Sequence, residues 1–173
     1  MFQITKPEPD EYFHYYGRYI ALAGVDALAT LRASAAATPR MLSGINESQA
    51  MFRYAPDKWS VKQVLGHVVD MERVFAYRAL SFARGDQTPL PGVDEGPWME
   101  SAPFDHRPLP ELVDEYVAVR AATLALAASL DAETQVRRGT ASGNAMSARA
   151  AIHCLAGHEL HHVNLLRERY GIA

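Results

Sequence analysis

Residues 60–85, SVKQVLGHVVDMERVFAYRALSFARG, form the most clearly helical segment of the sequence. Ser60 and Gln63 match a capping box, in which each side chain binds a backbone amide in the first turn of a helix. Gly85 is a favourable C-terminal stop. Apolar residues recur between these ends every three or four positions, as on one buried helix face, at Val61, Val64, Val68, Met71, Phe75, Ala79 and Phe82. The segment is therefore predicted to be one long amphipathic helix.

Three further segments have helical periodicity, and strand-like alternation is scarce. The first runs from about residue 25 or 26 to residue 42 and contains Pro39, which predicts a kink or an early stop. The second begins after the prolines at 108 and 110 and runs towards Leu130. The third begins near Ser147 and ends at residue 170, where Gly171 follows as a stop. Four long helices predict an all-α fold.

A long connection, residues 85–107, separates the residue 60–85 helix from the helix that runs towards Leu130. It contains four prolines, and also Trp98 and Phe104, which are unusual in disordered linkers. Loops of this length inside a compact domain are usually functional, so we expect a lid or a binding segment. The short aromatic segment at residues 11–16, EYFHYY, is expected to pack on the helices.

Length and composition exclude several classes of protein. The 173 residues suit a single domain, residues 1–173, with a substantial core. A net charge of -3 gives no support for binding to nucleic acid. A single cysteine, Cys154, excludes an internal disulfide and fits a reducing compartment. No apolar run approaches the ~20 residues of a membrane-spanning helix, and residues 1–7 lack the apolar core of a signal peptide. A cytoplasmic protein is expected.

Three histidines are placed to bind one metal ion. His158 and His162 lie four residues apart, so they share one face of the last helix, and His67 lies in the residue 60–85 helix. At ~100° per residue, His158 and His162 fall within or at the edge of the apolar arc, whereas His153 and His161 fall on the polar side. His67 also lies at an apolar edge. Three imidazole ligands leave an open coordination position, which is typical of catalytic metal sites.

Other interpretations of these residues remain open. A lone histidine on an apolar face is more often a hydrogen-bonded core residue than a ligand, and a pair spaced by four can arise by chance. Cys154 lies one turn before His158. It is either a small packing residue, a fourth ligand or a redox-sensitive neighbour of the metal.

Four charged residues are candidates for catalytic roles. Glu72 and Glu159 project into apolar arcs, and a buried carboxylate needs a partner. That partner is expected to be Arg78, Arg120 or the free ring N–H of a ligand histidine. Arg78 and Arg120 could instead bind an anionic group of a substrate, because guanidinium groups pair well with carboxylates and phosphates.

The sequence resembles the DinB/YfiT-like superfamily of metal-binding four-helix bundles. The resemblance lies in residues 54–67 (YAPDKWSVKQVLGH), 72–78 (ERVFAYR) and 157–162 (GHELHH), with further matches at residues 88–92 and Arg120. It implies a four-helix bundle of unusual handedness in a single DinB-like domain, and commonly a homodimer. It also implies a divalent metal, zinc or nickel in many members, bound by His67, His158 and His162.

The resemblance also indicates a range of activities. Family members include S-transferases that use bacillithiol, mycothiol or glutathione, and isomerases that use a low-molecular-weight thiol. A metal with an open position can ionise a bound thiol, which would give a thiol S-transferase acting on small electrophiles. It can instead activate water, which would give a metal-dependent hydrolase. A third alternative is a stress-induced metal-binding module without catalytic turnover. In the transferase, Arg78 and Arg120 would be candidates to bind the thiol cofactor.

Overall fold

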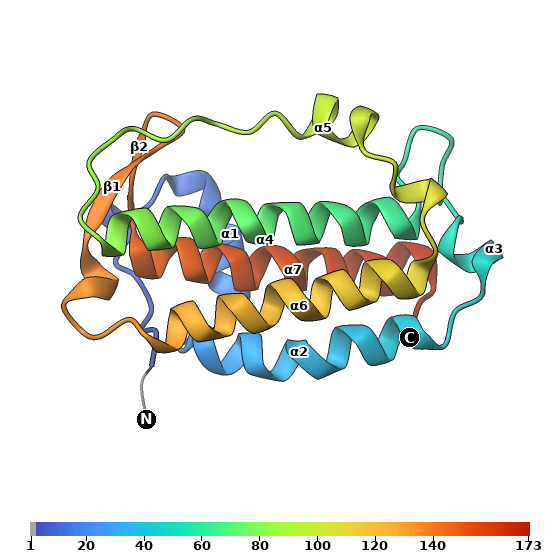
Figure 1. Ribbon diagram of the computed structural model, residues 1–173, viewed down its shortest axis with the longest axis horizontal. Helices are drawn as coiled ribbons and strands as arrows, with labels where there is room; N and C mark the ends of the chain where they lie inside the picture. The colour runs from blue at the N-terminus through green and yellow to red at the C-terminus, as the bar shows by residue number, and fades with distance from the viewer. Residues whose placement is uncertain (1–2) are drawn as a thin grey trace.

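The computed structural model describes residues 3–173, and four long helices run side by side along its long axis (Figure 1). They are α2 (Ala27–Ser43), α4 (Val61–Ala83), α6 (Leu109–Ala128) and α7 (Ala148–Tyr170). The connections contain α1 (Gly17–Leu22), α3 (Glu47–Ala50), α5 (Glu95–Ser101), β1 (Arg138–Ala141) and β2 (Asn144–Ser147). Single 3₁₀ turns lie at Pro9–Glu11, His14–Tyr16, Phe104–His106 and Thr134–Val136.

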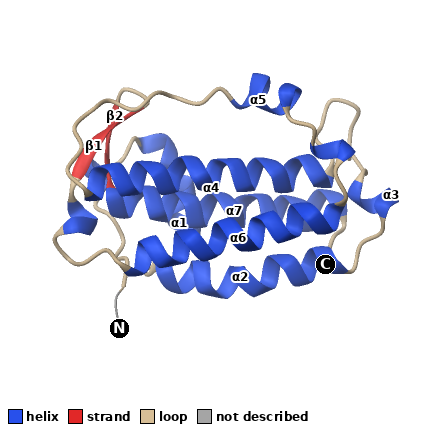
Figure 2. Cartoon of the chain, in the orientation of Figure 1, coloured by secondary structure: helices blue, strands red, loops and turns tan. Residues whose placement is uncertain are grey.

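The order of the helices around the bundle explains the long connection. Helix α4 packs against α6 and α7, and α2 packs against the same two helices. Helices α4 and α6 run in one direction along the bundle, whereas α2 and α7 run in the other (Figures 1 and 2). Because α4 and α6 are parallel neighbours, residues 84–108 must carry the chain back along the whole bundle. We call these residues the crossover segment.

The predicted helix boundaries are confirmed within one or two residues. Ser60 accepts a hydrogen bond from the Gln63 amide, and the Gln63 side chain binds the Ser60 amide, as expected for a capping box. Ser147 caps α7 by accepting a hydrogen bond from the Ala150 backbone N–H, and Gly171 ends the helix with a left-handed φ of 67°. A kink or an early stop was expected at Pro39, and the early stop is wrong, because α2 continues to Ser43. Pro39 removes its own backbone N–H bond, and the neighbouring turns carry the helix past it.

The all-α prediction is incomplete, because a two-stranded antiparallel hairpin connects α6 to α7. Strands β1 and β2 pair from Arg138 opposite Ser147 to Ala141 opposite Asn144. Ser142 and Gly143 form the turn with positive φ values of 52° and 76°, as in the tight turns that join two strands. Leu90 of the crossover segment binds Thr140 and Ser142 through its backbone. The hairpin therefore anchors the start of the crossover segment to the bundle.

His153 is fully buried, so its predicted place on the polar side of α7 is wrong. The N-terminal region covers that side of the helix: α1 packs along α7, and Tyr12 and Tyr16 pack on the core. The close crossing depends on Gly157, because a Cβ there would overlap the backbone of Tyr19. The aromatic segment thus packs on the bundle as expected. Its continuation into a helix was not predicted.

The apolar core is divided into two clusters along the bundle. One cluster includes Phe75, Phe82 and Ile152, at the end that carries the hairpin. The other includes Val64 and Leu166, at the opposite end. Along both α4 and α7, the residues between the clusters include buried polar side chains. No helix in residues 3–173 has the length and apolar character needed to cross a membrane.

Candidate metal centre

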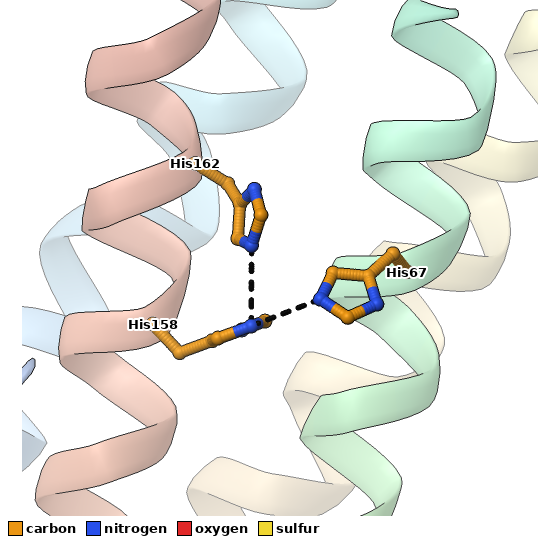
Figure 3. A group of neighbouring side chains, drawn as sticks. All are labelled: His67, His158 and His162. Atoms are coloured by element: carbon orange, nitrogen blue, oxygen red, sulfur yellow. Dashed lines mark hydrogen bonds between the residues drawn. The ribbon is translucent and has the colours of Figure 1, made fainter. Parts of the chain in front are cut away.

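The three histidines selected from the sequence meet between α4 and α7. His67 projects from α4, and His158 and His162 project from successive turns of α7 towards it (Figure 3). The Nε2 atom of His158 lies 3.1 Å from His67 Nε2 and 3.2 Å from His162 Nε2. One ligand atom of each residue lies within 4.8 Å of the others. Among the described residues, this is the cluster with metal-ligand character.

Burial keeps these imidazoles neutral. The three side chains are between 3% and 8% exposed. Burial lowers the pKa of His67 to about 4. Burial, together with the nearby His67, His161 and Arg18, lowers the pKa of His162 to about 3. Burial, followed by the proximity of the other histidines, places the pKa of His158 well below its usual value. A metal ligand must be unprotonated, so the cluster is ready to bind a cation at neutral pH.

The spacing of the nitrogen atoms fits a transition metal. Ligands at the usual Zn–N distance of ~2.0–2.1 Å lie about 3.3 Å apart in a tetrahedral site, which is close to the two observed separations. Three unprotonated imidazole nitrogens this close together repel one another, and a shared cation would satisfy their lone pairs better. The Cys154 thiol is not part of the cluster. Burial raises the pKa of Cys154, which fits a packing role.

The surroundings of the cluster include a carboxylate that sequence reasoning missed. Glu95, at the start of α5 in the crossover segment, places Oε2 3.7 Å from His67 Nε2. Two aromatic rings also border the cluster: the Tyr19 ring lies 5.4 Å from the His158 ring, and the Trp59 ring lies 4.8 Å from the His67 ring. Glu95 comes close to the cluster only because the crossover segment folds over the bundle. Its sequence neighbourhood has no periodicity that indicates this contact.

Two cavities border the histidines. A cavity of about 280 Å³ is bounded by His158, Phe75, Tyr16, Tyr19 and Glu95. A second cavity, of about 230 Å³, is bounded by His162, Trp59 and Tyr170, among others. The crossover segment was expected to contribute to binding, and its residue Glu95 lines the first cavity. Small molecules therefore have room beside the histidines.

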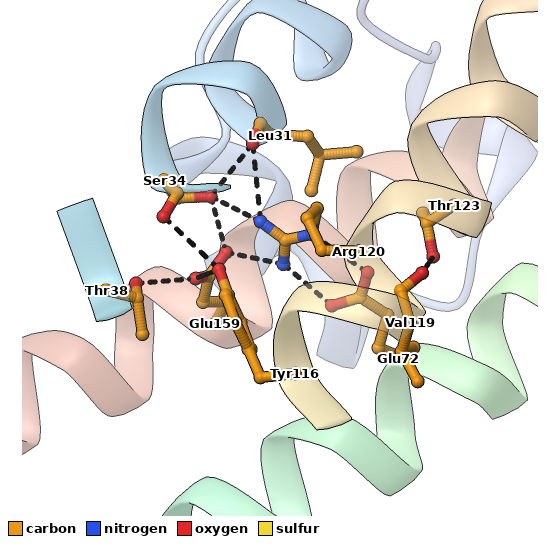
Figure 4. A network of polar contacts seen from close by, with 9 residues as sticks. All are labelled: Leu31, Ser34, Thr38, Glu72, Tyr116, Val119, Arg120, Thr123 and Glu159. Atoms are coloured by element: carbon orange, nitrogen blue, oxygen red, sulfur yellow. Dashed lines mark hydrogen bonds and ion pairs between the residues drawn. The ribbon is translucent and has the colours of Figure 1, made fainter. Parts of the chain in front are cut away.

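Arg120 lies in a buried polar network beside the metal centre (Figure 4). Its guanidinium bonds both oxygens of Glu72, at 2.8 and 2.7 Å, and one oxygen of Glu159 at 2.8 Å. Ser34, Thr38 and Tyr116 donate hydrogen bonds to Glu159. Burial disfavours the charge of Arg120, but these carboxylates hold its pKa above the usual value. Of the two roles considered for Arg120, the structure therefore shows pairing with the buried glutamates rather than a free guanidinium for substrate.

Arg78 does not join this network. It lies farther along α4, where it bonds the carbonyl of Pro91 and the hydroxyl of Ser142. Of the four charged candidates, the structure therefore brings Glu72, Glu159 and Arg120 together and places Arg78 apart. Glu159 follows His158 directly in α7, so the network fixes the helix turn that carries this candidate ligand.

The fold is similar to a solved structure described as "YfiT from Bacillus subtilis is a probable metal-dependent hydrolase with an unusual four-helix bundle topology". The two chains have 18% sequence identity and a TM-score of 0.75, over 97% of this chain and 94% of that chain. No match was found among curated proteins. Residues 30–166, which include all three histidines, match the DinB superfamily. This match and the bundle confirm the resemblance noted in the sequence, and the chain belongs to the DinB superfamily.

Proposed function

We propose that this protein binds one divalent metal through His67, His158 and His162 and is a metal-dependent hydrolase of small molecules. The observation that carries the proposal is the convergence of three neutral, buried imidazoles beside a carboxylate and a cavity. The similar YfiT structure is described as a probable metal-dependent hydrolase, which supports the same chemistry. Zinc and nickel are the expected ions because the family resemblance implies them, and imidazole ligands suit both.

The protein residues have separate roles in this proposal. A divalent cation held by the three histidines would supply Lewis acidity and make water a stronger acid. Glu95 would accept a proton from the attacking nucleophile, because its carboxylate reaches the side of the cluster where the Nε2 atoms converge. The cavity next to His158 would hold the substrate against Phe75 and Tyr19. The network of Arg120, Glu72 and Glu159 would keep α4 and α7 in register.

Two other functions would use the same site. A low-molecular-weight thiol in place of water would give the S-transferase that the family resemblance implies. A site without turnover would be a metal-binding module. The cavities beside His158 and His162 support an enzyme over the module, because they give a small molecule access to the metal.

Hydrolysis of activated esters and amides by the zinc- or nickel-loaded protein tests the proposal. Glu95→Gln should lower kcat by about a hundredfold, the scale expected for loss of a general base, while the metal content stays unchanged. Glu100→Gln is the matched control, because Glu100 is an exposed glutamate in the same helix. Conjugation of 1-chloro-2,4-dinitrobenzene to glutathione, mycothiol or bacillithiol, without ester or amide hydrolysis, would replace the hydrolase with the transferase. If the protein catalyses neither reaction, the remaining function is that of a metal-binding module.

A further inference from the structure

Arg78 is a buried cation without a counter-charge among the described residues. Its side chain is 3% exposed, and its hydrogen bonds go from Nη2 to Pro91 O at 3.1 Å and Ser142 Oγ at 3.2 Å. Both acceptors are uncharged. A guanidinium has five N–H donors and stays charged in proteins, and burying such a charge without a partner is costly. Arg120, in contrast, is paired with two glutamates. Arg78 therefore retains donors and a charge for an anion.

A cavity of about 380 Å³ lies beside Arg78, between α4 and the crossover segment. Its walls are mostly apolar and include Val74, Leu90, Val93 and Trp98. Two other charged residues at the cavity, Asp70 and Arg73, pair with each other at 3.3 Å, and Arg73 also pairs with Glu115 at 2.7 Å. The cavity has the size and the lining of a small-molecule site, with one buried charged group to orient the ligand.

We propose that this cavity binds a small monocarboxylate with an apolar body. The carboxylate would accept hydrogen bonds from Arg78, and its apolar part would lie against Val74, Leu90 and Trp98. A single uncompensated arginine matches one negative charge, and the apolar walls favour an anion with an apolar body over inorganic phosphate. The proposal does not depend on the chemistry of the histidine cluster.

The proposed ligand would lie next to the metal centre. The Phe75 ring stands between the two sites, with its centroid 5.4 Å from the Arg78 guanidinium carbon and 6.3 Å from the His158 ring. Val93 also lines both this cavity and the cavity beside His158. A carboxylate held by Arg78 would therefore be separated from the histidines by one aromatic ring.

Titration of the metal-loaded protein with benzoate, followed by NMR, tests the proposal. Saturable shifts are expected at the Trp98 indole and the Arg78 Nε–H. Benzyl alcohol has a similar shape without the charge, and inorganic phosphate has charge without the apolar body, so both should bind at least about tenfold more weakly. The His158→Ala variant should bind benzoate equally well, because the proposed site does not include the metal. A carboxylate that bound the metal itself would lose its site in this variant. Equal affinities for benzoate and benzyl alcohol, or loss of benzoate binding in His158→Ala, would overturn the proposal.

Matched variants locate the site. Arg78→Gln should weaken benzoate binding about tenfold or more, as expected for loss of a charged hydrogen-bond donor. Arg73→Gln, at the edge of the same cavity, should leave binding within about twofold, because its charge is already paired. Val74→Phe fills the cavity without touching the charge of Arg78 and should abolish binding. If Arg78→Gln does not fold, Val74→Phe decides: unchanged benzoate affinity in that variant would contradict the proposal.

Discussion

The carbonyl oxygen of Tyr19 occupies the space in which a Cβ on Gly157 would lie. Helix α1 therefore crosses α7 at backbone contact, and this places the Tyr19 ring against His158. Gly157 precedes His158, so the residue that permits the crossing also determines what covers the histidine cluster. A larger residue at 157 must move α1, α7 or both.

Gly157→Ala should lower the free energy of unfolding by about 2–4 kcal/mol, because the methyl group overlaps the backbone rather than a flexible side chain. Urea denaturation measures the loss. Gly44→Ala is the control: Gly44 has a φ of -90° and no atom near the added methyl group. This control should be neutral or stabilising by about 0.4–1 kcal/mol. Equal stabilities for the two variants would show that α1 does not cross α7 as described.

The purified protein should contain about one divalent metal ion per chain. Single replacements of His67, His158 or His162 by alanine should each remove most of it, as measured by elemental analysis. His161→Ala should retain the metal, although His161 belongs to the same sequence motif, because it is not part of the cluster. Metal loss in His161→Ala, or full retention in His67→Ala, would refute the ligand assignment.

Arg120→Met should destabilise the protein by about 3–5 kcal/mol, because Glu72 and Glu159 would remain buried without their cation. The pair between Lys58 and Asp57 is exposed, so Lys58→Gln should have no measurable effect. Chemical denaturation at pH 7 compares the two. Where Arg120→Met still folds, it should retain its metal. An unchanged stability together with lost activity would instead give Arg120 a catalytic role.

His153 should make the protein less stable in mild acid. Burial lowers the pKa of His153 to about 4 from the usual 6.5, so the unfolded chain binds a proton more readily than the folded protein. Stability is therefore lost as the pH falls below about 6.5, by about 1 kcal/mol between pH 7 and pH 5.5. His153→Leu should reduce the pH dependence of the unfolding free energy by that amount. The exposed His14→Asn variant serves as the control, and an unchanged pH dependence in His153→Leu would exclude this role.

Homodimer formation stays a prediction from the family resemblance. Light scattering at micromolar concentration should give about twice the chain mass of 19.1 kDa. A mass equal to one chain would exclude the dimer. Full-length protein loaded with metal is the appropriate sample, since metal binding stabilises the folded chain.

The helices could be predicted because their ends are encoded locally. Ser60 with Gln63 fixes the start of α4, and Ser147 with Gly171 fixes the two ends of α7, through contacts within a few residues. The pairing of His158 with His162 is equally local, since it follows from helix geometry. His67 could be added as the third candidate ligand because the apolar periodicity of its helix showed which side faces the core.

The remaining features depend on contacts between distant segments. His153 is buried by an N-terminal region whose helix has six residues, too short to show a clear period. The hairpin strands have four residues each and contain Gly139, which gives little strand-like alternation. Glu95 reaches His67 from the crossover segment, and Ser142 meets Arg78 across 64 positions of the chain. No local pattern indicates such contacts.

Because His67 and His158 are 91 positions apart, a metal ion bound by both would be a cross-link between the two halves of the chain. Closing a loop of that length restricts the unfolded chain by an amount comparable to a disulfide, about 4–5 kcal/mol in the entropic description. A cut within the crossover segment would leave His67 on one fragment, and His158 and His162 on the other. The two fragments would then be held together by their packing and by shared coordination of the ion, so that a chelator would weaken their association.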